Sequence, residues 1–278
     1  MDLKAIVLDL DGTLLNGEKL ISSRTKAKLI EAQEKGIKVI LASGRPTKSI
    51  LKYAEELELL KHDGFIISNN GAYVYDLKKE EIIFGQPISF EMKNKIINHL
   101  NQFDVVWMVD QGETMMVNDA FFDIDYELPP GYSSIVHFET RIGNFKVKEV
   151  EDYLEEIDQP VYKILVGGNP AYLQEHEEAI RAPFKNDVNL VFSAPYYMDY
   201  AALGIDKGNA LAESLPKLGI LPEQTISFGD GYNDRTLIEY AGVGVAMANA
   251  VPEILDLADA VTTSNDVDGI AEFLDQYF

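Results

Sequence analysis

The chain contains no cysteine, which excludes disulfide bonds, thiolate nucleophiles and zinc sites built on thiolates. Histidine is also scarce, and the four residues show no metal-ligand spacing, so we expect them at the surface or in structural roles. Long apolar runs are missing as well, because none approaches the ~20 residues that cross a bilayer. We therefore expect a soluble protein with a cytoplasmic location and no membrane partner.

Positively charged residues are also few. The chain has 24 Lys and Arg residues and 46 Asp and Glu residues, which gives a formal net charge of -22. Such a chain repels nucleic-acid backbones at long range, so no nucleic-acid partner is expected. A phosphorylated ligand would need local positive charge or a metal cation at its site. The length of 278 residues, 46% of them hydrophobic, suits one large domain or two modest ones. The sequence does not indicate the oligomeric state.

Strand and helix patterns alternate in two stretches of the chain, residues 1–84 and 201–278. Such alternation predicts βαβ units with right-handed crossovers and therefore a parallel sheet. The expected strands are residues 6–8, 37–41, 65–67, 225–228, 243–245 and 260–262, with a hairpin at 73–75 and 82–84. The expected helices are residues 23–35, 46–60, 208–218, 233–240 and 270–277. The fold class is thus α/β, with a Rossmann-like core made from both stretches.

Residues 85–200 have a different character, with aromatic and β-branched segments mixed with helical ones. This pattern predicts an α+β module inserted into the first domain, with strands at 105–109, 114–117, 163–166 and 189–192 and helices at 91–100 and 171–179. Several large side chains in or near these strands are candidate ligand contacts, although the same residue types are more often core: Trp107, Met115, Tyr132, His137 and Tyr197.

Two aspartates follow the first buried strand in the segment Asp9-Leu10-Asp11-Gly12-Thr13. The carboxyl end of a strand in an α/β sheet is where ligands bind, and a carboxylate can serve as a covalent nucleophile in phosphoryl transfer. The pair also resembles the start of a calcium loop, but the twelfth position from Asp9 is Leu20 where such a loop needs a Glu. An acidic turn without function remains the plain alternative.

Three further polar segments stand at or near the expected ends of other strands or the starts of helices. A hydroxyl and a glycine at a helix N-terminus, as in Ser43-Gly44-Arg45, can bind a phosphate oxygen. Lys207-Gly208 precedes a helix, and the loop Gly229-Asp230-Gly231-Tyr232-Asn233-Asp234 offers the oxygen ligands that Mg²⁺ prefers. Each has an ordinary structural interpretation alone, namely a helix cap, a surface lysine and a turn. Parallel strands would bring them together at one edge of the sheet.

The order of these motifs resembles the haloacid dehalogenase superfamily. Further stretches are similar to its Cof-like sugar-phosphatase branch: Asn70-Gly71-Ala72, Ala241 to Met247, and Val261 to Asp266. In that branch the insert is a cap domain of type IIB that sets substrate specificity. Three positions depart from the pattern, with Ala248 where Gly is usual before Asn249, Leu255 where Lys is common, and Asp206 where a small or hydroxylic residue is usual.

The resemblance implies a Mg²⁺-dependent phosphatase that hydrolyses small phosphorylated metabolites, such as sugar phosphates, through an aspartyl phosphate. Asp9 would be the nucleophile, Asp11 the acid and then the base, and Lys207 the residue that neutralises phosphoryl charge. The resemblance also implies phosphate binding by Thr13, Ser43, Gly44 and Asn233, and shaping of the cleft by Arg45 and Asn70. Mg²⁺ would be bound by Asp9, the main-chain oxygen of Asp11 and Asp230. Asp234 would hold metal-bound water or Lys207 without binding the metal directly.

Two other functions stay open from the sequence. A phosphosugar mutase would use the same residues and return phosphate to sugar instead of water. A non-catalytic ligand-binding or regulatory protein on the same scaffold would be expected to lose Asp9, Asp11 or Lys207, and all three are present. The identity of the phosphorylated metabolite cannot be inferred from the sequence.

Overall fold

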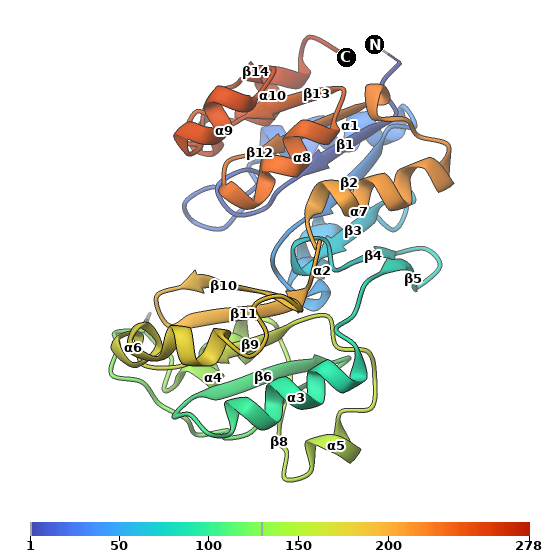
Figure 1. Ribbon diagram of the computed structural model, residues 1–278. Coiled ribbons are helices and arrows are strands. Elements are labelled where there is room, and N and C mark those ends of the chain that lie inside the picture. Colours follow the sequence, from blue (N-terminus) through green and yellow to red (C-terminus); the bar gives the residue numbers. More distant parts are fainter. Residues whose placement is uncertain (1, 129) are drawn as a thin grey trace. The chain divides into compact units, whose positions relative to one another are not determined.

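The computed structural model of the protein describes residues 2–128 and 130–278. It divides the chain into two compact units, one made of Met1–Gly85 and Ile205–Phe278 and the other of Gln86–Gly204. The sequence analysis expected the first stretch to end at residue 84 and the inserted module to end at residue 200. In the structure the corresponding ends are residues 85 and 204. Each unit has its own sheet and its own hydrophobic core, and each is described by itself (Figure 1).

The sheet of the first unit has eight strands in the order β14-β13-β12-β1-β2-β3-β4-β5. The six strands from β14 to β3 run parallel, and β4 and β5 continue the sheet antiparallel. The expected parallel core and the hairpin are therefore confirmed. The strands are β1 (Ala5–Leu8), β2 (Lys38–Ala42), β3 (Phe65–Ser68), β4 (Tyr73–Asp76), β5 (Glu81–Gly85), β12 (Thr225–Gly229), β13 (Val243–Ala246) and β14 (Ala260–Val261).

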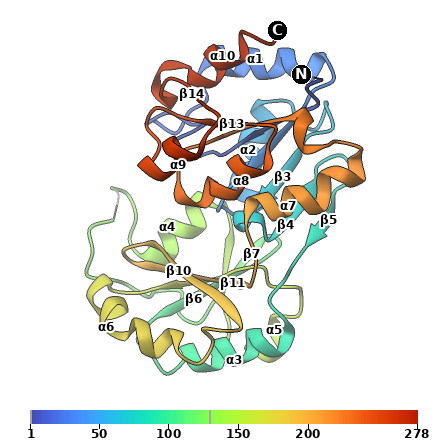
Figure 2. The same ribbon diagram turned by 45° about the horizontal axis from the view of Figure 1, so that its top comes forward.

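Helices cover both faces of this sheet (Figure 2). On one face α1 (Ser23–Glu34), α2 (Thr47–Glu56) and α10 (Gly269–Leu274) pack on alternate strand residues such as Ile6 and Leu8. On the other face α7 (Lys207–Ser214) and α8 (Arg235–Tyr240) pack on the intervening residues, such as Ala5 and Val7. Burial on both faces explains why β1 is apolar throughout. The short helix α9 (Pro252–Leu257) packs beside α8.

Local signals explain where several helices begin and end. The side chain of Ser22 accepts a hydrogen bond from the amide of Thr25 and starts α1. The helix expected over residues 208–218 is shorter as an α-helix, because α7 ends at Ser214 and a 3₁₀ segment, Leu215–Leu218, follows. Pro216 lacks the amide that would continue the helix. The expected helix over 46–60 likewise ends early, at Glu56.

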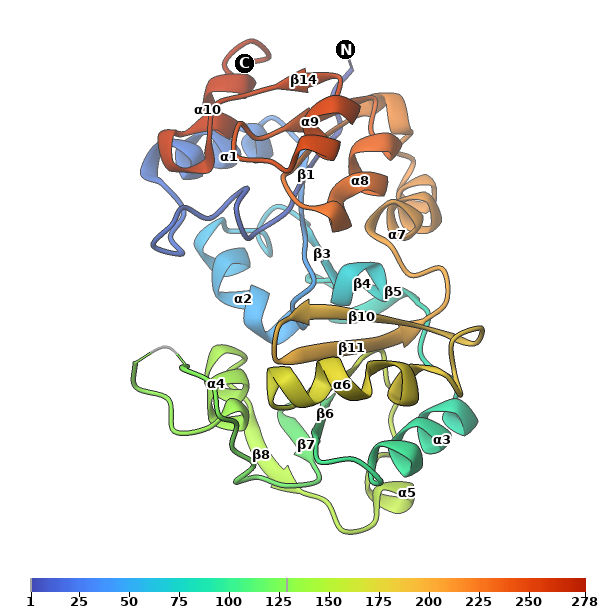
Figure 3. The ribbon, with the colours of Figure 1, turned by 60° about the vertical axis from the view of Figure 1, so that its left-hand side comes forward.

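The second unit has a six-stranded sheet in the order β10-β11-β9-β6-β7-β8 (Figure 3). Its strands are β6 (Val106–Gln111), β7 (Thr114–Val117), β8 (Lys146–Glu149), β9 (Ile164–Gly167), β10 (Val188–Ala194) and β11 (Tyr197–Ala202). The helices α3 (Phe90–Leu100) and α6 (Pro170–Arg181) share one core with Trp107, and α4 (Ile135–Ile142) belongs to a second core with Met108. The short α5 is Tyr153–Glu156. The expected α+β character is confirmed.

The sequence analysis missed β8, β11, α4 and α5 in this unit. The four residues of β8 are all exposed, so the strand has no apolar alternation to reveal it. Of the large side chains considered as ligand contacts, Trp107, Met115 and Tyr197 are buried in the cores, whereas Tyr132 and His137 are half-buried and contact each other edge to face. Within the described residues, no helix has the length and apolarity that crossing a membrane requires.

Candidate active site

The polar segments singled out in the sequence follow neighbouring strands of the first unit. Strand β1 lies between β12 and β2, and all three run parallel. Asp9 follows β1, Ser43 follows β2 and Asp230 follows β12, so the three residues lie along one edge of the sheet. This is the edge where α/β sheets place their ligands.

Lys207, the first residue of α7, lies between two of the carboxylates. Its ammonium Nζ is 2.6 Å from Asp9 Oδ1 and 2.6 Å from Asp234 Oδ1, and the lysine side chain is completely buried. Burial alone would lower the pKa of Lys207, but Asp234 and Asp9 more than offset it and hold this pKa above its ordinary value. The lysine is therefore a fixed positive charge beside Asp9.

Asp206, which departs from the family pattern, has a structural explanation. Its side chain accepts a hydrogen bond from the amide of Asn209 at 2.7 Å and so caps the N-terminus of α7. It holds the first turn of the helix that carries Lys207. The structure thus explains this departure from the family pattern by a capping role.

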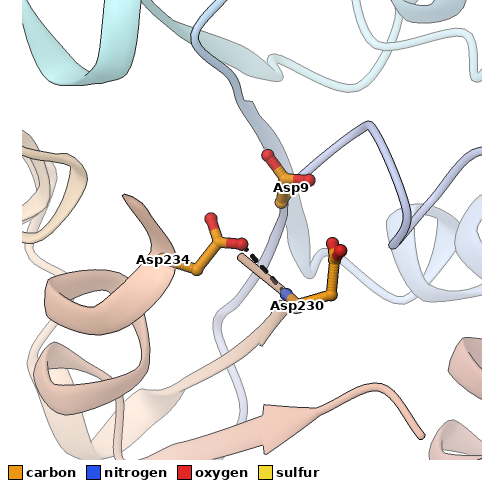
Figure 4. Close-up of side chains that lie close together, drawn as sticks. All are labelled: Asp9, Asp230 and Asp234. Carbon is orange, nitrogen blue, oxygen red and sulfur yellow. Dashed lines mark hydrogen bonds between the residues drawn. The ribbon is translucent and has the colours of Figure 1, made fainter. Parts of the chain in front are cut away.

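Asp234 holds both Lys207 and the loop after β12. Its Oδ2 accepts a hydrogen bond from the amide of Asp230 at 2.9 Å (Figure 4). The amide of Gly231 donates to the same oxygen, also at 2.9 Å. Because Oδ1 is bonded to Lys207, both oxygens of this carboxylate are already engaged. Asp234 thereby fixes the position of Asp230 relative to the lysine.

Asp9, Asp230 and Asp234 form a group that could hold a metal ion. One carboxylate oxygen from each lies within 4.8 Å of the others, and no second such group occurs within residues 2–128 and 130–278. Burial, reinforced by the charge of Asp234, raises the pKa of Asp9 to about 8. Burial also raises the pKa of Asp230 to about 6. Three carboxylates beside one ammonium leave a surplus of negative charge, which a cation would neutralise.

The loop that carries Asp9 and Asp11 is held tightly against Asp230. The hydroxyl of Thr13 donates a hydrogen bond to Asp230 Oδ1 at 2.6 Å. Gly12 has φ +89°, and a Cβ at this position would lie 2.3 Å from Asp230 Oδ2. Only glycine combines this backbone conformation with so close an approach to the carboxylate. In this structure the Thr13 side chain therefore orients Asp230.

The carboxylate of Asp11 accepts hydrogen bonds from two positively charged side chains, those of Arg45 and Lys19. The guanidinium of Arg45 donates from Nε to Oδ2 at 2.7 Å and from its terminal nitrogen to Oδ1 at 2.6 Å. The ammonium of Lys19 donates to the same Oδ1 at 2.8 Å. Burial alone would raise the pKa of Asp11, but the bonds from Arg45 and then Lys19 outweigh it and lower the pKa below its usual value. The side chain of Asp11 is thus an ionised carboxylate in this conformation.

The remaining predicted residues lie around the loop after β2. Ser43 is buried, and its hydroxyl oxygen accepts the amide of Arg45. The amide of Asn70 donates to the carbonyl of Ser43, and a Cβ on Gly44 would lie 3.0 Å from Asn70 Oδ1. The exposed Asn233 donates from Nδ2 to the same Asn70 oxygen at 3.0 Å. Asn70 therefore links the segment after β2 to the loop after β12.

Two residues that contact the Asp9 to Asp11 loop were missed by the sequence analysis as site residues. Lys19 bonds to Asp11 from an irregular loop, where no periodic pattern places a side chain. Asn249, which contacts the carbonyl of Gly12, follows Ala248, one of the positions that depart from the family pattern, and no chemical role was inferred for it. Its position close to the stretch Ala241 to Met247, which carries the family resemblance, was the only signal in the sequence that pointed toward it.

Comparison with known proteins agrees with this geometry. The family model described as haloacid dehalogenase-like hydrolase matches residues 6–274. The chain belongs to the haloacid dehalogenase-like hydrolases. Its match to the family spans both sequence segments of the first unit and the whole inserted unit, and the expected membership is confirmed.

The matches to individual relatives in this family extend over nearly the full length of both chains. The chain is 30% identical to phosphatase YwpJ of Bacillus subtilis, over 98% of this chain and 99% of that protein. The crystal structure of a haloacid dehalogenase-like hydrolase from Bacteroides thetaiotaomicron superposes with a TM-score of 0.89 at 34% identity, covering 99% and 100% of the two chains. The structure of the HAD subclass IIB sugar phosphatase BT4131 superposes with a TM-score of 0.74 at 26% sequence identity, covering 99% of this chain and 98% of that one. These likenesses confirm the fold and support a phosphoric monoester hydrolase.

Proposed function

We propose that the protein is a Mg²⁺-dependent phosphatase that hydrolyses small phosphorylated metabolites, such as sugar phosphates, through an aspartyl phosphate on Asp9. The observation that carries the proposal is the placement of Lys207 against Asp9 and Asp234, with Asp230 beside them, at the end of β1. A nucleophilic carboxylate, a fixed cation and a set of oxygen ligands are the parts that phosphoryl transfer from a monoester needs.

The donor set fits Mg²⁺. All candidate ligands are oxygens, which this hard cation prefers. Burial, reinforced by the charge of Asp234, raises the pKa values of Asp9 and Asp230, and a divalent ion would stabilise their ionised forms. Asp9 and Asp230, with the main-chain oxygen of Asp11, would hold the cation, and Asp234 would support them through Lys207 and the loop amides. When bound, the cation would offset the repulsion between Asp9 and a phosphate dianion.

Asp9 would attack phosphorus through Oδ2. Its other oxygen, Oδ1, is held by Lys207, whereas Oδ2 has no hydrogen bond from any residue in the described part of the chain. Bond formation from Oδ2 to phosphorus would break the bond between phosphorus and the leaving oxygen. Lys207, Ser43, Gly44 and Asn233 are the groups assigned to the phosphoryl oxygens, and Thr13 would act by orienting Asp230.

Asp11 would transfer the protons. In the first half-reaction its carboxyl would give a proton to the leaving oxygen, and in the second the resulting carboxylate would take a proton from the water that attacks phosphorus. Hydrolysis would release inorganic phosphate and restore Asp9. Since Asp11 is ionised and bonded to Arg45 and Lys19 in this conformation, the proton-donating state requires these bonds to loosen. We assign substrate selection, that is, which phosphate monoester is hydrolysed, to the inserted unit, residues 86–204.

Phosphate release from a panel of hexose phosphates, flavin mononucleotide and pyridoxal phosphate tests the proposal, with Mg²⁺ or with EDTA. We expect release by the wild type with Mg²⁺, none with EDTA, and a loss of at least about a thousandfold in Asp9→Asn. Asp256→Asn, at an exposed position of α9, is the matched control and should keep full activity. Release by Asp9→Asn at the wild-type rate would refute the nucleophile, and transfer of phosphate within a sugar instead of to water would indicate a mutase.

A further inference from the structure

The proposed mechanism leaves Asn249 without a role, although this residue reaches the loop of Asp9 and Asp11. Asn249 is exposed and lies in the turn between β13 and α9. Its side-chain Nδ2 donates a hydrogen bond to the carbonyl oxygen of Gly12 at 2.7 Å. The bond joins positions 237 residues apart, so it connects the C-terminal segment of the unit directly to the loop after β1.

The same turn is bonded to the loop after β12. The amide of Val251 donates to the carbonyl of Asp230 at 2.9 Å, and the amide of Met247 donates to the carbonyl of Gly229 at 3.1 Å. The turn of residues 247–251 therefore holds two loops at once. One loop carries Asp230, and the other carries Asp9 and Asp11.

Gly12 is the point where the two loops touch. A Cβ on Gly12 would lie 2.3 Å from Asp230 Oδ2, so there is no slack between this residue and the carboxylate. Thr13, the next residue, donates its hydroxyl to Asp230 Oδ1. A shift of the Gly12 carbonyl away from Asn249 would thus displace the backbone that packs against Asp230.

A second asparagine fixes the orientation of the Asn249 amide. The backbone amide of Asn265 donates to Asn249 Oδ1 at 3.2 Å, which identifies that atom as the acceptor and leaves Nδ2 to face Gly12. The side chain of Asn265 donates to the carbonyl of Leu15 at 2.7 Å, and the amide of Gly17 donates to Asp266 Oδ1 at 2.8 Å. The loop after β1 is held at three successive points by the C-terminal segment.

We propose that Asn249 is a positioning residue, which sets the distance between the Asp9 to Asp11 loop and Asp230 and thereby the affinity of the site for a divalent cation. The inference rests on the proposed function for its chemical meaning. Residues that orient metal-binding carboxylates without touching the metal typically change affinity or activity ten- to a hundredfold when replaced. Because Asn249 is exposed, its replacement removes the hydrogen bond without opening a cavity in the core.

Two variants test the bond itself. Asn249→Ala deletes the donor, whereas Asn249→Asp keeps the shape but turns an acceptor toward the Gly12 carbonyl and so opposes the contact. Asn98→Ala, at an exposed position of α3, is the control. The readouts are the dissociation constant for Mg²⁺ by calorimetry on the metal-free protein, kcat and KM for phosphate release, and hydrogen–deuterium exchange of peptides covering residues 10–17.

We expect both Asn249 variants to weaken Mg²⁺ binding about tenfold or more and to lower kcat by a similar factor. KM should change less than about threefold, and exchange should accelerate in residues 10–17 while the rest of the unit exchanges as in the wild type. A general acceleration with a large loss of thermal stability would overturn the proposal in favour of a purely structural role. Unchanged Mg²⁺ binding together with unchanged exchange in residues 10–17 would also overturn it.

The failure of the proposed function has a different signature. If the wild type neither binds Mg²⁺ nor releases phosphate, the function is wrong, and the exchange measurement alone then decides whether Asn249 positions the loop. Faster exchange confined to residues 10–17 in Asn249→Ala supports the positioning role, and exchange equal to the wild type refutes it.

Discussion

Arg45 holds Asp11 through two parallel hydrogen bonds, one from Nε at 2.7 Å and one from a terminal nitrogen at 2.6 Å. Such a forked pair is stronger and more directional than a single contact, and Lys19 adds a third donor. Both oxygens of Asp11 are engaged, so the carboxylate is stabilised in the form that accepts protons. Asp11, which the proposed mechanism uses to donate a proton in the first half-reaction, is thus held here in the ionised state that the second half-reaction would use.

Replacing Arg45 should change the pH range in which Asp11 can act as an acid. In Arg45→Gln the bond that holds the pKa of Asp11 below its usual value is lost, so this pKa should rise. A general acid donates only from its protonated form, and the alkaline limit of phosphoenzyme formation should therefore move to higher pH. Single-turnover rates measured across pH check this. Arg24→Gln, which breaks an exposed ion pair with Asp275, should leave the profile as in the wild type. Equal profiles for all three proteins would contradict the expectation.

Replacing Lys207 should destabilise the fold as well as abolish turnover. Lys207→Met leaves Asp9 and Asp234 buried without their counter-charge, and breaking a buried pair in this way costs about 3–5 kcal/mol. Urea unfolding in EDTA measures the loss. Lys217→Met, at an exposed lysine just beyond α7, is the control and should unfold as the wild type does. A Lys207→Met protein with wild-type stability would show that the lysine is not the counter-charge of these carboxylates.

Mg²⁺ binding should strengthen as the pH rises from 6 to 8. Burial and Asp234 raise the pKa of Asp9 to about 8, and burial raises the pKa of Asp230 to about 6, so protons occupy these groups and must leave when the cation binds. Calorimetry in two buffers of different ionisation enthalpy counts the released protons. Asp230→Asn should bind more weakly and release fewer. An affinity independent of pH in the wild type would contradict the expected proton release.

The raised pKa of Asp9 also makes the stability of the metal-free protein depend on pH. Because the pKa of Asp9 is raised from 3.8 in the unfolded chain to about 8 in the folded one, the native state binds more protons than the unfolded state between these values. The contribution of Asp9 to stability is therefore present below pH 3.8 and is lost as the pH rises toward 8. In EDTA, Asp9→Asn should gain in melting temperature relative to the wild type as the pH rises from 5 to 8.5. A constant difference between the two proteins would contradict this.

A Cβ on Gly12 should displace Asp230. Gly36→Ala provides a matched comparison, because Gly36 has φ +84° and nothing lies within 4 Å of its Cβ position, whereas Gly12 has φ +89° and faces Asp230 at 2.3 Å. Gly36→Ala should cost only the backbone strain, about 1–2 kcal/mol. Gly12→Ala should cost more than this and should also weaken Mg²⁺ binding about tenfold or more. Equal losses in both variants, with unchanged Mg²⁺ binding, would show that the approach to Asp230 is not important.

The sequence was sufficient to predict the gathering of Asp9, Ser43 and Asp230 at one sheet edge. Each follows a short apolar run, and parallel strands end at the same edge, so the proximity follows from local patterns and one topological rule. Lys207 was predicted through a motif alone, since a lysine before a helix is ordinary. Its complete burial between two carboxylates depends on how α7 packs against the sheet, which local sequence does not specify.

The polar contacts that hold the site together could not be predicted in the same way. The bond from Asn249 to Gly12 and the bond from Thr13 to Asp230 join residues more than 200 positions apart. Their geometry depends on loop conformations, and loops lack the periodicity that identifies strands and helices. The pairing of Lys19 with Asp11 has the same origin, since both residues lie in one irregular loop.

The order of the strands has a consequence for the synthesis of the protein. Asp9 emerges from the ribosome well before its partner Lys207, which lies 198 positions later, and the hydroxyl of Thr13 can bond to Asp230 only after translation has advanced 217 positions beyond Thr13. The inserted unit is translated in between, and β1 has to wait for β12 to complete its pairing. A nascent chain that ends before residue 230 therefore lacks the carboxylates of Asp230 and Asp234. Activity should appear only after Asp234 has been translated, and chains terminated before Asp230 should be inert.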